Sequence, residues 1–328
     1  MTVTGRFRVV AGAAGAALLW LAVAGCGTTS EEPFASNPVG DEAEADGAAA
    51  TTADPDPDCN EDDPTASIDP GATLAELDVA TVGGLVADIR SRGTLRAGVG
   101  ADTLLFGYLN PQTAELEGFD VEIARLVAGA ILGSPDQVEL IPVQSPDRIA
   151  RLQDGSVDIV VKTMTITCTR WAEIDFSSVY YEAGQKLLVG TDSGIAGLDD
   201  ISGEQICAVS DTTSLRRLVD NGVTPVESSS WTECLVKFQQ GEADGVSTDD
   251  TILAGLVTQD PYAEVVGDAF SSEPYGIGLP PDSPDLTRVV NAVLEQARTD
   301  GTWQALYDEW LAETLGPASS VPEASYRP

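Results

Sequence analysis

The chain has 328 residues, enough for about two domains of typical size. It carries 53 acidic residues against 17 basic ones and has no histidine, so its formal net charge is −36 at pH 7. So acidic a chain is not expected to bind nucleic acid, or to adhere to an anionic membrane through basic patches. In this setting an arginine placed in a cleft is a candidate for binding a specific anionic ligand.

The N-terminal segment, residues 1–25, has the pattern of a secretory signal peptide. Arg6 and Arg8 precede an apolar run that is too short to span a membrane comfortably. Small residues stand directly before Cys26 in "LAVAGC", which resembles a bacterial lipoprotein box. The pattern predicts that Cys26 is lipidated and becomes the mature N-terminus. An uncleaved anchor helix is the alternative.

Residues 26–66 consist mainly of Ala, Asp, Glu, Pro, Thr and Gly, with almost nothing to bury. No lysine or arginine occurs between Arg8 and Arg90. A segment of this composition is expected to be a disordered, self-repelling tether.

Four cysteines remain if Cys26 carries lipid: Cys59, Cys168, Cys207 and Cys234. An even number in an exported protein suggests two disulfides, for which three pairings are possible. A metal site is not favoured, because the chain has no histidine and no CxxC pair.

Folded sequence is expected from about residue 70, where apolar residues recur at helical or strand spacing. Strands are predicted at 94–100, 137–143 and 157–166, and helices at 82–93, 118–132 and 145–155. The pattern then restarts, with strands at 185–190, 205–210, 224–228 and 243–248 and helices at 212–222, 230–241 and 250–259. Residues 273–280 lead into two last helices at 283–301 and 302–316, and 317–328 reads as a loop-like tail. Alternating strands and helices predict an α/β fold with largely parallel sheets, and by themselves suggest two consecutive domains.

Several stretches together resemble one known family. They are "GTLRAGVG", "LEGFDVEIARLVA", "RIARLQDGSVDIV", "TITCTRWAEIDFSSVYYEAGQKLLV", "DTTSLRRL", "CLVKFQQGEADGVSTDDTILAG", "EPYGIGLP" and "DGTWQALYDEW". The set resembles family 3 of the bacterial extracellular solute-binding proteins, the polar amino-acid family, and within it the actinobacterial glutamine/glutamate-binding lipoproteins. The resemblance covers most of the sequence expected to fold.

The resemblance implies a two-lobed α/β fold of the periplasmic-binding-protein type II (Venus flytrap), with two hinge strands near 180–184 and 273–278. The first lobe would then comprise 67–181 and 276–316, and the second lobe 185–272. With these lobes, Cys207–Cys234 would lie within the second lobe and Cys59–Cys168 would fix the tether to the first. Pairing Cys168 with a cysteine of the second lobe would clamp the cleft shut, which argues against it.

By the same resemblance, Arg170 forks onto the α-carboxylate of an amino-acid ligand through its paired donors. Thr163 and Thr165 match positions that contact the ligand's α-carboxylate and α-amino group. Threonine at a strand end also simply fits β geometry, and this is the structural alternative.

The second lobe is expected to supply the remaining contacts to the α-carbon groups. Asp249 matches the acid that pairs with the ligand ammonium, with Asp250 as the rival. Thr213 matches a contact in the loop "DTTS" just before a helix, whose N-terminus can bind carboxylate oxygens. Asp211 stands where the family usually has glycine, and this departure leaves the loop's conformation open.

The ligand side chain is expected to meet Ser145 and Arg148, which match positions that contact the side-chain carboxylate in aspartate/glutamate binders. A solvated helix arginine is the alternative for Arg148. Trp231 could donate its indole N–H, and Lys162 either adds positive charge or points to the opposite face of its strand. Gly100 departs from both the glutamine and the acidic-residue binders. Two arginines against one aspartate favour glutamate and aspartate over their amides, which remain open as ligands.

The predicted protein is therefore a lipid-anchored, extracytoplasmic and monomeric receptor without a cofactor, which presents its closed form to an ABC permease or a transmembrane sensor. An enzyme on the same fold, dehydratase-like or cleaving cell-wall sugars, is the alternative, with Glu182 or Asp249 as a lone acid. A structural cell-wall lipoprotein is a third interpretation.

Overall fold

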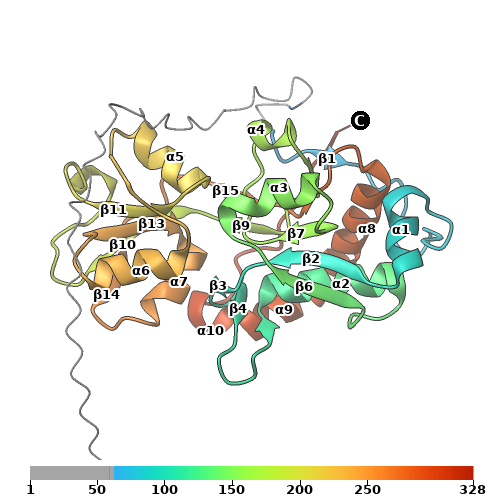
Figure 1. The fold of residues 1–328 in the computed structure, drawn as a ribbon, viewed down its shortest axis with the longest axis horizontal. Helices are drawn as coiled ribbons and strands as arrows, with labels where there is room; N and C mark the ends of the chain where they lie inside the picture. The colour runs from blue at the N-terminus through green and yellow to red at the C-terminus, as the bar shows by residue number, and fades with distance from the viewer. Residues whose placement is uncertain (1–58, 60–62, 328) are drawn as a thin grey trace, which may run out of the picture. The chain divides into compact units, whose positions relative to one another are not determined.

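The computed structural model describes Cys59 and residues 63–327, which form two α/β lobes (Figure 1). The predicted signal peptide, Cys26 and most of the predicted tether lie outside these residues. Within the described part of the chain, no helix is long and apolar enough to cross a bilayer.

The first lobe is built on a five-stranded sheet in the order β6-β2-β7-β16-β8. Its strands are β2 (Leu95–Val99), β6 (Val138–Pro142), β7 (Ile159–Val161), β8 (Asp175–Phe176) and β16 (Gly278–Leu279). Its helices are α1 (Gly84–Arg92), α2 (Phe119–Leu132), α3 (Arg148–Gln153), α4 (Cys168–Trp171), α8 (Pro284–Asp300), α9 (Thr302–Trp310) and α10 (Ala312–Leu315), with a 3-10 turn at Ser145–Asp147. β2 runs parallel to β6 and β7, whereas β16 is antiparallel to both of its neighbours.

The second lobe repeats this plan with the order β12-β11-β13-β10-β14. Its strands are β10 (Gln185–Gly190), β11 (Ile206–Val209), β12 (Val226–Ser228), β13 (Gly245–Asp249) and β14 (Ala263–Val266), and its helices are α5 (Thr213–Asp220), α6 (Trp231–Gln239) and α7 (Asp250–Val257), with a 3-10 turn at Leu198–Asp200. β10 is the antiparallel strand here. Each sheet therefore contains one antiparallel strand that the chain enters directly from the crossing between the lobes.

Two antiparallel strands carry the chain between the lobes: β9 (Tyr181–Ala183) and β15 (Glu273–Tyr275). After β15 the chain returns to the first lobe, where α8 and α9 pack in one hydrophobic core with α1 and α2 (Figure 1). Residues buried in this core include Val86, Phe119, Val290 and Trp303. Sequence pattern alone suggested two consecutive domains, and it fails here because the last helices bury their apolar faces against elements from the start of the fold.

The strand predicted over 157–166 is shorter in the structure. The sheet ends at Val161, and Thr163 adopts a φ of 37°, in the left-handed region that non-glycine residues rarely occupy. Farther on, the N–H of Ile166 donates to the carbonyl of Pro274 at 2.8 Å. The threonine-rich segment therefore leaves the sheet and runs beside the hinge strand β15.

Small sheets that the sequence pattern did not predict complete the fold. The strands β3 (Asp102–Thr103), β4 (Gly107–Leu109) and β5 (Leu116–Glu117) form an antiparallel sheet in the first lobe. β1 (Ser67–Ile68) pairs with β17 (Tyr326–Arg327), so the predicted loop-like tail ends in a strand that joins the two ends of the described chain.

Both predicted disulfides are present. Cys207–Cys234 links β11 to α6 in the fully buried core of the second lobe. Cys59–Cys168 ties the N-terminal arm, which comprises Cys59 and residues 63–66, to α4. The arm is also held by Trp171, whose indole N–H donates to the carbonyl of Pro64 at 2.8 Å.

The lobes approach each other closely at Gly255 in the middle of α7. A Cβ added at Gly255 would lie 2.9 Å from the carbonyl oxygen of Leu104 in the first lobe, so one backbone would have to shift. Alanine normally stabilises a helix interior by about 0.5–1 kcal/mol relative to glycine. The glycine is therefore best explained by the contact between the lobes.

We expect Gly255→Ala to push the lobes apart without lowering the melting temperature. Small-angle X-ray scattering should show a larger radius of gyration than for the wild type. Gly129→Ala in α2 is the matched control, because a Cβ there meets its nearest neighbour, the amide nitrogen of Pro135, only at 3.7 Å. Equal radii for all three proteins would contradict the role of Gly255 in closure.

Candidate functional site

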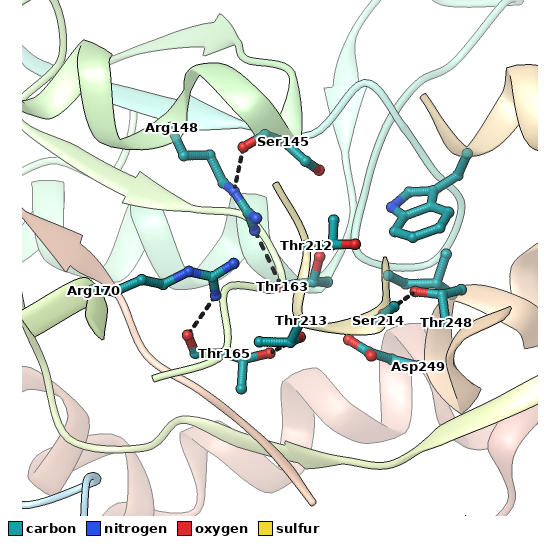
Figure 2. Close-up of a pocket in the computed structure, with 12 residues that line it drawn as sticks. Ser145, Arg148, Thr163, Thr165, Arg170, Thr212, Thr213, Ser214, Thr248 and Asp249 are labelled. Carbon is teal, nitrogen blue, oxygen red and sulfur yellow. Dashed lines mark hydrogen bonds between the residues drawn. The ribbon is translucent and has the colours of Figure 1, made fainter. Parts of the chain in front are cut away.

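A small cavity lies between the two lobes and is lined by polar side chains from both (Figure 2). Its volume is about 10 Å³, room for about one water molecule. The lining residues are Ser145, Arg148, Thr163, Thr165 and Arg170 from the first lobe and Thr212, Thr213, Ser214, Trp231, Thr248, Asp249 and Ile252 from the second. Eight of the nine predicted ligand contacts are thus brought together at one cavity.

Arg170 extends from the short helix α4, where the hydroxyl of Thr167 accepts the N–H of Arg170 at 3.2 Å. Its guanidinium donates to the carbonyl of Thr165 at 2.6 Å and, across the cleft, to the carbonyl of Asp211 at 3.1 Å. Burial lowers the pKa of Arg170 to about 10, so the group is still a cation at neutral pH.

Arg148, at the start of α3, is the second buried cation of the cavity. Its guanidinium donates to the carbonyl of Ser145 at 2.9 Å and to that of Lys162 at 3.1 Å. Burial, with the neighbouring charge of Arg170 as a smaller cause, lowers the pKa of Arg148 to about 9. Within the described chain, neither arginine has a carboxylate within 4.0 Å, so both charges are held by carbonyl oxygens alone.

Asp249 ends strand β13 and faces the two arginines from the other side of the cavity (Figure 2). The hydroxyl of Tyr275 donates to its Oδ2 at 2.5 Å, but the buried Oδ1 has no hydrogen-bond partner among the described residues. Burial, reinforced by the charge of Glu273, raises the pKa of Asp249 to about 8. An unpaired buried acceptor is costly, and an N–H donor placed in the cavity would relieve that cost.

The left-handed backbone of Thr163 is held by Asp120, a residue that sequence reasoning did not select. The N–H of Thr163 donates to the Asp120 carboxylate at 3.0 Å, and the hydroxyl of Tyr180 donates to the other oxygen at 2.7 Å. Burial raises the pKa of Asp120 to about 6. The acid in "GFD" at the start of α2 was the available signal.

Thr213 is the first residue of α5, and Thr212 caps this helix by accepting the N–H of Leu215 at 3.1 Å. The first N–H groups of a helix have no partner within it and are suited to carboxylate oxygens. Asp211 has a φ of 57°, so the loop makes a left-handed turn at the position that the resemblance marked as a departure from glycine. Aspartate tolerates this region better than most residues, which resolves the open question about the departure.

Glu273 in the hinge strand β15 is a second residue that sequence reasoning missed as part of the site. It is fully buried behind the cavity wall, and the hydroxyls of Thr165 and Thr213 donate to its Oε2 at 2.8 Å and 2.7 Å. The stretch "EPYGIGLP" indicated a hinge, but nothing in it showed which side chains the glutamate would meet.

Lys162 does not line the cavity. Its ammonium pairs with one carboxylate oxygen of Asp102 at 3.4 Å. The other Asp102 oxygen accepts the backbone N–H of Trp231, across the cleft, at 3.1 Å. A Cβ at Gly100 would lie 3.5 Å from the lysine nitrogen. Lys162 therefore lies beside Gly100, which has no side chain, and its charge is paired with Asp102 instead of facing the cavity.

Comparisons with known proteins agree with this architecture. The sequence profile of the family described as bacterial extracellular solute-binding proteins, family 3, matches residues 95–313. The chain is 36% identical to the ABC transporter glutamine-binding protein GlnH of Bacillus subtilis, over 70% of this chain and 85% of the relative. It is 32% identical to the glutamate-binding protein GluB of Corynebacterium glutamicum, over 77% and 89%. Among solved structures, the solute receptor for L-cysteine of Neisseria gonorrhoeae superposes with a TM-score of 0.68 at 26% identity, over 70% of this chain and 95% of that chain.

Closure of the unoccupied cleft is expected to depend on pH through Asp249. Because its pKa is raised in the closed form, the closed form prefers the protonated acid. Closure without ligand is then fully favoured below the ordinary pKa of about 4 and is lost as the pH rises towards about 8, by at most tenfold per pH unit.

Tryptophan fluorescence between pH 4.5 and 9 can report this change, because Trp231 lines the cavity. Asp249→Asn should remove the part of the change that comes from closure, and any change from the titration of Asp120 within the first lobe should be the same in both proteins. A wild-type signal that stays flat between pH 5 and pH 8 would rule out this role of Asp249.

Proposed function

We propose that this chain, which belongs to family 3 of the bacterial extracellular solute-binding proteins, binds a dicarboxylic α-amino acid, L-glutamate or L-aspartate, between its lobes. One observation carries the proposal. Two buried guanidinium groups without a carboxylate partner share a cavity with a buried carboxylate oxygen that has no partner among the described residues.

The match to the family profile confirms the family that the sequence motifs predicted, and the structural neighbour confirms the two-lobed α/β fold. The family consists of binding proteins, and the relatives and structural neighbours are named for the solutes they bind. The chain is accordingly a binding protein and not an enzyme.

We assign the α-carbon groups of the ligand to the lower part of the site in Figure 2, around Thr165, Thr213 and Asp249. The α-carboxylate is assigned to Arg170, whose planar guanidinium is suited to a bidentate contact, and to the N–H groups at the start of α5. The α-ammonium is assigned to the unpaired Oδ1 of Asp249.

The ligand side chain is assigned to the end of the cavity bordered by Ser145, Arg148 and Trp231. Once a ligand ammonium holds Asp249 in its ionised form, two arginines against one aspartate leave the cavity with one uncompensated positive charge. A ligand with a second carboxylate cancels that charge, whereas an amide leaves it buried and unpaired. This balance supports glutamate and aspartate over glutamine and asparagine, although two relatives, at 36% and 39% identity, are named glutamine-binding proteins.

Ligand capture requires the lobes to move, because a cavity of about 10 Å³ is far too small for an amino acid. We take the open form to admit the ligand and the closed form to be stabilised by it. A membrane protein then recognises the closed form. An ABC permease is supported by the name of the Bacillus relative, and a transmembrane sensor could recognise the same shape.

The N-terminal segment supports a place at the outer face of the cell membrane. Residues 1–25 and Cys26 have the pattern of a lipoprotein signal, and the acidic segment that follows would hold a monomeric receptor away from the bilayer. Cys59 then ties the end of this segment to the first lobe.

Calorimetry with Arg170→Ala and Arg148→Ala tests the assignment of the two arginines. Arg170→Ala should weaken the binding of both glutamate and glutamine by about a hundredfold or more, since it removes a bidentate contact to the α-carboxylate that both ligands carry. Arg148→Ala should lower the preference for glutamate over glutamine by about tenfold or more.

Arg151→Ala is the matched control, because Arg151 lies on the same helix and is exposed. Both affinities should be unchanged in this variant. A glutamate preference that survives Arg148→Ala would contradict the assignment of the side-chain carboxylate.

Cys26→Ser tests the lipid anchor. In the native host, the wild type should be found in the membrane fraction with a lipid on its N-terminal peptide by mass spectrometry. The variant should lack this lipid modification. Wild-type protein with an unmodified Cys26 would disprove lipidation.

A further inference from the structure

Glu273 receives four hydrogen-bond donors in the middle of the molecule. Its Oε2 accepts the hydroxyls of Thr165 and Thr213, and its Oε1 accepts Arg217 at 3.0 Å and the hydroxyl of Ser271 at 2.6 Å. The carboxylate is fully buried in the hinge strand β15, and its donors come from both lobes. This glutamate therefore connects the ligand-facing threonines of both lobes to the hinge strand.

These contacts fix the hydroxyl protons of both threonines. A threonine hydroxyl has one proton and two acceptor lone pairs, whereas a carboxylate can only accept. At 2.8 Å and 2.7 Å, each hydroxyl must donate to Glu273. The two hydroxyl oxygens lie 3.3 Å from each other, and neither has a second proton to share.

Towards the cavity, both hydroxyls can consequently only accept a hydrogen bond. Thr165 and Thr213 line that cavity, in which Asp249 already presents an oxygen without a partner among the described residues. Three acceptors, from both lobes, thus line the same small cavity. A group with several N–H donors satisfies them all, whereas a carboxylate oxygen there would be repelled by each.

We infer that Glu273 is a positioning residue that sets the polarity of Thr165 and Thr213 and thereby selects ligands with an α-ammonium group. The inference rests on the proposed function, since it assigns the ammonium end of the same ligand. It also separates the two halves of the α-carbon site: Arg170 and the start of α5 take the carboxylate, and the threonine hydroxyls and Asp249 take the ammonium. Arg217 holds Glu273 from behind without lining the ligand cavity.

Glu273→Gln tests the inference because it keeps the shape and replaces an acceptor oxygen by an N–H₂ donor. A hydroxyl that meets this donor turns its proton towards the cavity and opposes the ammonium. Calorimetry should compare L-glutamate with L-2-hydroxyglutarate, in which a neutral hydroxyl replaces the ammonium. We expect the preference for glutamate to fall by about tenfold or more, with a smaller change for hydroxyglutarate.

Glu182→Gln is the matched control, since it makes the same chemical change at an exposed position of the partner hinge strand β9. It should leave both affinities unchanged. If Glu273 only stabilises the hinge, Glu273→Gln should lower the affinities for glutamate and hydroxyglutarate by the same factor, and that result overturns the inference. A wild type that binds neither glutamate nor aspartate would instead refute the proposed function.

Thr213→Val and Thr213→Ser decide the question if Glu273→Gln does not fold, as judged by circular dichroism and melting temperature. The serine keeps a hydroxyl that can donate to Glu273, whereas the isosteric valine removes it. The preference for glutamate over hydroxyglutarate should survive in the serine variant and fall in the valine variant. An unchanged preference in the valine variant overturns the inference.

Discussion

Buried charge without an opposite charge beside it is the constraint on which the rest of the structure depends. Arg148 and Arg170 are buried cations held by carbonyl oxygens, and Asp249 keeps one oxygen without a partner among the described residues. Such groups cost free energy unless they are paired, so the closed cleft is incomplete by itself. The proposed ligand, a zwitterion with a second carboxylate, would supply the missing partners, and its binding would then stabilise the closed form.

The fold keeps these charges on separate bodies. Both arginines belong to the first lobe, and Asp249 ends a strand of the second lobe, reached through the hinge strands β9 and β15. Because residues of both lobes line the cavity, closure brings these charged groups together around whatever lies between them. The free energy of closure then depends on what the cavity holds.

Sequence reasoning located the fold and most of the cavity because the family motifs carry both. It placed Arg170, Arg148 and Asp249 at one cleft, but it could not show that Lys162 would turn to Asp102 instead. Asp120 and Glu273 were missed for a related reason. Their partners lie far away along the chain, and the direction of a hydroxyl proton depends on atoms that no local pattern specifies.

In the described part of the chain, the N-terminal arm is linked to the first lobe and not to the second. Cys59 is bonded to Cys168, two residues before Arg170, and Arg327 lies over the ring of Trp171 in the same helix at 4.4 Å. With Cys26 lipidated as proposed, this link would fix the first lobe to the anchor and leave the second lobe free to move relative to it. The first lobe carries the two arginines that line the cavity of this strongly acidic protein. Under the proposed function, a dicarboxylate would therefore meet its attractive charges on the first lobe, and Asp249 would reach the ammonium group when the second lobe closes.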